Sequence, residues 1–438
     1  MALNRAGAAH LLRRAAMGGT TAQIDEFVGL TREQAVNRLL DTSSSAALPG
    51  WGRFNSGDED WVAHTKMIDW WVDRMITAPP TIEEKLTLFL HGHFATGRDK
   101  VTDSRLMWDQ HVDIRRFGQG SFRVLLEKIS LGSAMLIYLD NETNVKGAEQ
   151  ENFARELMEL FTLGNARFTE TDVVSMAKAW TGHNTVGANR ENNWVYDPTY
   201  IFRAGEHDNS QKALFGITKN WDATDTLDEI CFGVKANTMS DFIARKMFQF
   251  YVHTNPSQAV VDELAAGFRN SDLNIKSLLR SILLHPQFWH ADTRYALVKS
   301  PVEYMVDIMR RNGLRAVTED NVRWFMNMMG MTLFEPPSVA GWGQNSYWLS
   351  TARAWAKSLF ANSLKWDADE RGVLQNLDDL TSEQVVNVIL TFFSIFEVSE
   401  QTRENMVILI DTTRTERPWA MTTEPFAVGM HMPEVQVA

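Results

Sequence analysis

Hydrophobic residues recur at spacings of three and four along most of the chain, which is the period of an amphipathic helix. Thr31–Gln34 and Thr381–Gln384 have the form of capping boxes, in which threonine and glutamine side chains satisfy free backbone groups at a helix start. The pattern therefore predicts a mainly α, multi-helix globular protein. Its helices are expected near residues 59–77, 82–93, 100–116, 121–130, 149–163, 169–180, 239–252, 256–269, 273–285, 299–312, 318–329 and 350–364.

Three segments break this helical period. Residues 41–58 are rich in Ser, Gly and Pro, which is typical of a long surface loop. Residues 183–219 are rich in Asn, Gly and Asp, and only Trp194–Tyr196 and Thr199–Phe202 alternate there as strands do. From Thr412 onward the period is lost, so we predict an extended or partly disordered tail. The centre of the chain is thus expected to be loop-rich, with at most a small β-hairpin.

These breaks predict four parts. They are an N-terminal helical half at 1–181, a loop-rich insertion with a hairpin at 182–220, a C-terminal helical half at 221–365, and a terminal helix with an extended tail at 366–438. A chain of 438 residues is long enough for two or three such units or for one large helical domain.

Composition and charge exclude several classes of protein. Lys and Arg number 43 against 55 Asp and Glu, a net charge of -12, which opposes a nucleic-acid binder because such a protein needs a basic face. The single cysteine, Cys231, excludes an internal disulfide and a zinc site built from cysteines. Nothing matches a phosphate-binding glycine loop, a dinucleotide fingerprint, a nucleophile elbow or the helical zinc-protease signature.

The apolar runs predict no membrane segment. Met1–Gly7 has no long apolar core, so no export signal is visible at the start. The longest apolar run, near Leu131–Leu139, is far shorter than the roughly 18 to 20 residues that a membrane span requires. We therefore expect a cytoplasmic protein without a membrane span; export remains open if a leader has been removed.

A His-x-His pair ends the helix expected at 82–93. Glu84 and His91 share one helical face, whereas His93 lies about 200° round the axis from His91. Gly92 would allow the helix to fray and bring His93 back. Neutral imidazoles at this spacing suit zinc, iron, copper or nickel. Alternatively, His91 pairs with a carboxylate and His93 packs under the following loop.

A second candidate lies on the helix expected at 149–163. Asn152, Glu156 and Glu159 are spaced i, i+4 and i+7, so one face carries an amide and two carboxylates. Two carboxylates this close repel each other unless a metal or a shared proton lies between them. The alternative is a solvated face on which Arg155 screens Glu151.

Two loops carry further candidates. His207 and Asp208, with Arg203 nearby, lie in the irregular centre, where they suit a general base, an added metal ligand or simply a hydrogen-bonded turn. Residues 334–348, called the Trp-rich loop below, contain Trp342, Tyr347 and Trp348 beside a glutamine and an asparagine. Aromatic faces with amide neighbours suit sugars, although such aromatics also plug cores.

Several of these segments together resemble the bacterial family catalogued as domain of unknown function 1800. The similar segments are residues 8–18, 84–94, 138–141, 151–164, 221–230, 242–246, 299–303 and 334–348, so the resemblance spans about residues 6 to 364. The stretch NFARELMELFTLG at 152–164 is the most specific of them.

The resemblance implies no known activity. Many relatives are exported and encoded beside a sulfatase-like companion, so a companion of that kind is an expected partner, whereas this chain resembles the leaderless members. Glu149-Gln150 stands where the family usually has Pro-Asn, and His183 where it usually has Trp. Because the His-x-His pair and the Glu-rich helix both belong to the family pattern, the resemblance points to a shared site.

Our leading hypothesis is a metal-dependent enzyme of unknown substrate, with hydrolysis favoured over oxidation. Its divalent ion (zinc, iron or manganese) would be bound by His91, His93, Glu156 and Glu159. Catalysis would involve Glu156, His207 and Asp208. The substrate would be bound by Trp342, Tyr347, Trp348 and Arg203. The alternative is a non-catalytic module that binds a glycan, another small molecule or a protein through the Trp-rich loop. A third hypothesis, a haem protein using His91, His93 or His183, lacks an attachment motif.

Overall fold

The computed structural model describes residues 2–55, 59–186, 199–316, 321–370, 372, 377 and 379–438, without the side chains of residues 186 and 367–370. The fold is mainly α, as predicted. The N-terminal helices are α1 (Arg5–Ala15), α2 (Thr21–Asp25), α3 (Arg32–Leu40), α4 (Asp60–Thr77), α5 (Glu83–His93), α6 (Ser104–Phe117), α7 (Phe122–Ser130), α8 (Ser133–Tyr138), α9 (Asn152–Glu156), the π-helix η3 (Leu157–Thr162) and α10 (Glu170–Ala179).

The second half of the chain is also mainly helical. Its helices are α11 (Ala223–Cys231), α12 (Ala236–Tyr251), α13 (Gln258–Asn270), α14 (Ile275–Leu284), α15 (Pro301–Arg311), α16 (Val322–Met329), α17 (Thr351–Glu370), α18 (Ser382–Phe392), α19 (Glu400–Glu416), α20 (Glu424–His431) and α21 (Pro433–Gln436). None of the described helices is long and apolar enough to cross a membrane.

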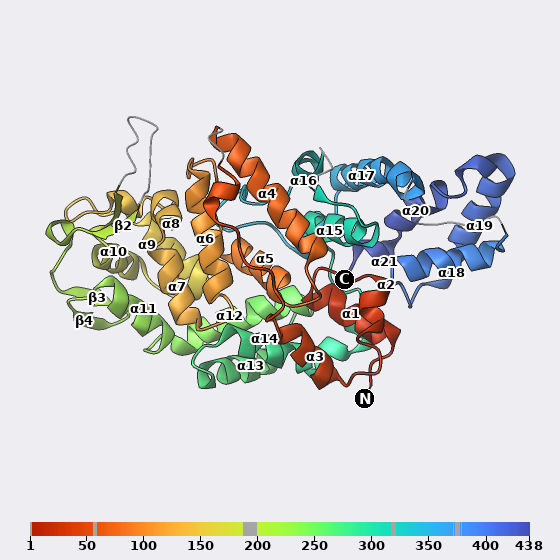
Figure 1. The fold of residues 1–438 in the computed structure, drawn as a ribbon. Coiled ribbons are helices and arrows are strands. Elements are labelled where there is room, and N and C mark those ends of the chain that lie inside the picture. The colour runs from red at the N-terminus through yellow and green to blue at the C-terminus, as the bar shows by residue number, and fades with distance from the viewer. Residues whose placement is uncertain are drawn as a thin grey trace.

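The molecule is elongated, with two small hairpins at one end, helices α18 to α20 at the other, and α4, α5, α6 and α15 between them (Figure 1). The end of the chain returns to this middle part, where Val437 and Val298 form an isolated antiparallel bridge. The middle of the molecule therefore combines elements from both halves of the sequence.

Local signals in the sequence predicted most helix starts well. Thr31 and Thr381 each form the expected capping box with the glutamine three positions on. Ser300 and Glu303 form another at the start of α15, where Pro301 occupies the first turn. A proline there costs no hydrogen bond, because the first backbone N–H groups of a helix have no acceptor within it.

The centre of the chain differs from the expected single hairpin. Strand β2 (Thr199–Phe202) pairs with β1 (His183–Val186), which showed no strand pattern, whereas the expected partner Trp194–Tyr196 lies outside the described residues. A second hairpin joins β3 (Lys212–Leu214) to β4 (Ile217–Lys219). These three-residue strands are too short to show an alternating pattern, and they are joined by a tight turn through Gly216.

The extended tail expected from Thr412 is wrong, because α19 continues to Glu416 and two further helices follow. The prolines at 425 and 433 lie in the first turns of α20 and α21, so they start helices rather than break them. Phe426 and Met430 of α20 are completely buried. The division of the chain at residues 181, 220 and 365 stays a prediction.

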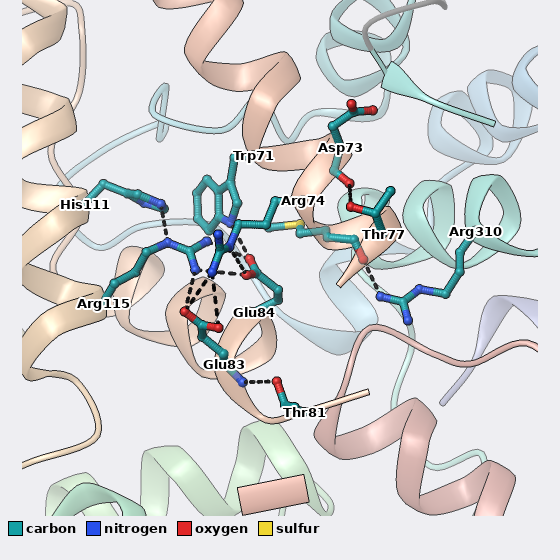
Figure 2. A network of polar contacts seen from close by, with 11 residues as sticks. Trp71, Asp73, Arg74, Thr77, Thr81, Glu83, Glu84, His111, Arg115 and Arg310 are labelled. Carbon is teal, nitrogen blue, oxygen red and sulfur yellow. Dashed lines mark hydrogen bonds and ion pairs between the residues drawn. The ribbon is translucent and has the colours of Figure 1, made fainter. Parts of the chain in front are cut away.

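A buried network of charges holds the start of α5 between α4 and α6 (Figure 2). The Glu84 carboxylate accepts hydrogen bonds from Arg115 at 2.6 and 2.9 Å, from Arg74 at 2.8 Å and from the Trp71 indole at 3.0 Å. Burial alone would raise the pKa of Glu84, but the two arginines hold it below its usual value. This network fixes the position of α5, whose other end leads to the candidate site.

Candidate functional site

A cavity of about 260 Å³ lies where α5, α12, the start of α15 and the Trp-rich loop meet. Helix α5 lines it with Lys85, Leu88, Phe89, Gly92 and His93. These positions recur every three or four residues, so they form one face of the helix. At 1.5 Å per residue, Lys85 and His93 lie about 12 Å apart along the axis, and the cavity runs between them.

The Trp-rich loop is held against α5 by a close approach of two glycines. Gly341 has φ +74°, and a Cβ atom at this position would lie 2.3 Å from the carbonyl oxygen of Gly92. Only glycine avoids that clash and adopts this φ without strain. The ring of Trp342 consequently lies 5.3 Å from that of His91, and the loop closes one side of the cavity.

Two of the three aromatic residues predicted to bind substrate line the cavity. Trp342 and Trp348 do so and are only 9% and 3% exposed, so both also pack in the core. The indole N–H of Trp342 is buried without a hydrogen-bond partner in the described part of the chain. Tyr347 does not line the cavity; it is 46% exposed and stacks against the guanidinium of Arg353.

The charged groups around the cavity are mainly cations. Arg14, Lys85, Lys246 and Lys299 line it, against the single carboxylate side chain of Glu303 among the described lining residues. Lys85 forms an ion pair with Glu303. Lys299 donates to Asp307 at 2.8 Å and to the Val435 carbonyl at 2.9 Å. Two of the four cations are therefore compensated by carboxylates.

Arg14 and Lys246 have no carboxylate among their described contacts. One nitrogen of Arg14 donates to the Thr293 carbonyl at 2.5 Å, and its other two are buried without a partner in the described structure. Burial, with a smaller contribution from Arg13, lowers the pKa of Arg14 to about 9. Burial likewise lowers the pKa of Lys246 to about 8.

Lys246 contacts neutral groups. Its ammonium donates to Nδ1 of His93 at 2.9 Å and, more weakly, to the Leu160 carbonyl at 3.5 Å, and it lies 5.2 Å from the ring centre of Phe242. His93 Nε2 donates to the Phe161 carbonyl at 3.0 Å, which leaves Nδ1 as the acceptor for Lys246. Burial and the charge of Lys246 hold the pKa of His93 well below its usual value, so His93 is neutral.

The two histidines predicted to bind a metal are engaged in other contacts. Both ring nitrogens of His93 are engaged, and Nε2 of His91 accepts from the backbone N–H of Phe334 at 3.1 Å. Burial lowers the pKa of His91 to about 3. Among the described residues, no group of three or more His, Cys, Asp or Glu side chains is placed to hold a metal ion. This arrangement does not fit the expected divalent ion, whose presence stays a prediction.

The Glu-rich helix changes its geometry between the two glutamates. Asn152 and Glu156 lie on α9, but residues 157–162 form a π-helix, so the α-helical spacing used for Glu159 does not apply. Burial, and next the charge of Glu159, raise the pKa of the half-buried Glu156. The two carboxylates thus lie near each other, as expected. Neither lines the cavity.

The candidates of the central segment lie outside the cavity. His207 Nδ1 contacts the Thr181 carbonyl at 2.9 Å, and Asp208 accepts from the backbone N–H of Ser210 at 2.7 Å, which is the hydrogen-bonded turn considered above. Arg203 pairs with Glu206 at 3.4 Å. His183 contacts the Tyr200 hydroxyl at 2.9 Å. The structure does not bring these residues to His91 or His93 in any contact that it describes.

Sequence reasoning missed the cations of the cavity. All four of them (Arg14, Lys85, Lys246 and Lys299) lie in segments that carried the family resemblance. One signal was available: Lys85 and Lys246 interrupt otherwise apolar helix faces, where a lysine is rarely placed without a reason. The geometry therefore centres on a cationic cavity with aromatic walls.

The comparisons with known proteins agree with the family resemblance. A family model described as "Protein of unknown function (DUF1800)" matches residues 10–437. No curated protein and no solved structure matches the chain significantly. The matched range extends past residue 364 to the last helix and includes the cavity-lining residues from Arg14 to Trp348.

Proposed function

The chain belongs to the DUF1800 family of proteins of unknown function, and from this premise we propose that it binds a small polar molecule, of sugar size, in the cavity under the Trp-rich loop. The observation that carries the proposal is the joint presence of Trp342, Trp348 and Gln344 in the wall of one cavity. Its volume of about 260 Å³ is close to the lower end of the roughly 300 to 1,000 Å³ usual for small-molecule sites.

The chemistry of the walls supports this ligand class. The indole rings provide apolar faces, and Gln249, Gln344 and Ser300 provide hydrogen-bonding groups that converge on the same space. A sugar has the matching alternation of C–H faces and hydroxyl groups.

The proposal corresponds to the second hypothesis from the sequence rather than the first. The metal-dependent hydrolase stays a prediction, and elemental analysis of the purified protein tests it. A sulfatase-like companion protein stays a prediction as well. Binding in the cavity requires neither, so it can be tested with the isolated chain.

Gly92 offers a direct test of the cavity. It lies on the cavity face of α5, and a Cβ atom added there meets only Trp342, at an ordinary 4.0 Å. We therefore expect Gly92→Ala to fold normally and Gly92→Leu to fill the cavity. Calorimetric titration with a panel of neutral and acidic mono- and disaccharides should show binding to the wild type, retained binding by Gly92→Ala, and no binding by Gly92→Leu.

The alanine variant is the matched control for folding. Both substitutions remove a helical glycine, which favours the helix by roughly 0.5 to 1 kcal/mol, so neither should unfold α5. If the wild type binds none of the sugars, or if Gly92→Leu binds them as well as Gly92→Ala does, the cavity is not the ligand site and the proposal is wrong.

A further inference from the structure

The charges around the cavity are not balanced. Of its four lining cations, Lys85 is paired with Glu303 and Lys299 with Asp307, which lies behind the wall. Arg14 and Lys246 contact no carboxylate in the described structure. Moving a cation out of water without a counter-charge is costly, so an anion entering this space would gain strong electrostatic stabilisation.

Of Arg14 and Lys246, Lys246 is the better placed to bind an anion in the cavity. The unpaired nitrogens of Arg14 are closed off from water, whereas Lys246 is not completely buried and lines the cavity. An ammonium has three hydrogens, and in the described structure they have one good acceptor, His93, and one distant acceptor, Leu160. Lys246 can therefore donate a further hydrogen bond to a ligand without losing an existing one.

The groups around Lys246 are neutral. His93 is a neutral imidazole because burial and the charge of Lys246 hold its pKa well below the usual value, and Phe242 presents an aromatic ring. No negative charge within these contacts competes for the ammonium. Arg14, the other lining cation without a carboxylate among its described contacts, adds to the positive potential inside the cavity.

On the basis of the proposed function, we propose that the molecule bound in the cavity is an acidic sugar, and that its oxyanion, a carboxylate or a sulfate, pairs with the ammonium of Lys246. The indole faces of Trp342 and Trp348 would contact the ring of the same molecule. A charge-assisted hydrogen bond to Lys246 then selects the acid over its neutral analogue.

The experiment compares glucuronic acid, glucose 6-sulfate and glucose as ligands of the full chain by calorimetry. We expect at least one of the two acids to bind the wild type about tenfold to a hundredfold more tightly than glucose. Lys246→Met should remove this preference, so that this variant binds the acids no more tightly than it binds glucose. Lys246→Arg, which keeps the positive charge, should retain most of it. The two acids distinguish a carboxylate from a sulfate as the preferred oxyanion.

Lys357 provides the matched control. Burial also lowers its pKa to about 8, but it does not line the cavity. Lys357→Met should therefore leave the preference for acids intact. If glucose binds as tightly as both acids, or if Lys246→Met keeps the preference, the assignment of Lys246 is overturned while the cavity remains a sugar site. Absence of binding by all three ligands would overturn the proposed function together with this inference.

Discussion

Lys85 and Lys246 are both lysines of the cavity wall, but their charges are compensated differently. Lys85 forms an ion pair with Glu303, whereas the strongest contact of Lys246 is the neutral imidazole of His93. A charge without a counter-charge is retained at a cost to the folded state. Residues kept at such a cost are candidates for binding, because a ligand can supply the missing charge.

We predict that Lys246→Met stabilises the protein although it weakens the binding of acidic sugars. Burial lowers the pKa of Lys246 from 10.5 to about 8, and each unit corresponds to about 1.4 kcal/mol. The gain at neutral pH should be about 1 to 3 kcal/mol, measured by denaturant unfolding. Because the pKa is lower in the folded state, the cost is present below about pH 8 and fades as the pH rises towards 10.

Lys357→Met is again the control variant, here for the stability measurement. Its pKa is lowered to about 8 mainly by burial, so a similar stabilisation is expected, without any effect on ligand binding. A clear loss of stability in Lys246→Met, or a gain that does not shrink at high pH, would show that the ammonium is not an uncompensated charge in the folded protein.

At the scale of single residues, the sequence identified part of the cavity lining. His93, Trp342 and Trp348 were singled out from their spacing and chemistry, and all three line the cavity. The partners of His93 were not predictable, because Phe161 and Lys246 are 68 and 153 positions away in the chain. Helical spacing describes which residues share a face and carries no information about what packs against that face.

At the scale of elements, α5 connects the buried charge network to the cavity. Glu84 near its start binds Arg74 of α4 and Arg115 of α6 (Figure 2). His93 at its end contacts α12 through Lys246. The network therefore sets the position of the helix face that lines the cavity. A disturbance at Glu84 should be transmitted to the ligand site mainly as a loss of stability.

We predict that Glu84→Gln destabilises the protein by about 3 kcal/mol, the lower end of the range for breaking a buried ion pair, because Arg74 and Arg115 then share the single carboxylate of Glu83. Denaturant unfolding measures the change. Glu127→Gln is the control: Glu127 pairs with Arg123 at 3.2 Å but is partly exposed, and such pairs contribute roughly 0 to 1 kcal/mol. Equal, small effects of the two substitutions would contradict the view that the Glu84 network holds α5 in place.

At the scale of the whole molecule, the last residues of the chain complete the cavity wall. Val435 of α21 is 2% exposed, and its carbonyl accepts from Lys299 at 2.9 Å. Val437 pairs with Val298 directly before the start of α15. The end of the chain therefore supports the segment that brings Lys299 and Ser300 to the cavity.

We predict that removing residues 433–438 lowers the stability by about 2 to 4 kcal/mol. A buried valine contributes roughly 1.5 to 3 kcal/mol, and the hydrogen bond from Lys299 adds about 1 kcal/mol. Ligand binding should weaken at the same time, because the segment at residues 297–300 loses its pairing. Thermal unfolding and calorimetric titration measure the two effects. A shortened chain with unchanged stability and affinity would show that this segment does not support the site.

The sequence by itself determined the helices and most of their starts, because hydrophobic period and capping are properties of a few neighbouring residues. It also determined the family, through segments that resemble it and a match over residues 10–437. Only the tertiary structure decided the composition of the cavity. Its cations come from α1, α5, α12 and the start of α15, and whether each has a counter-charge depends on contacts through space that no local pattern encodes.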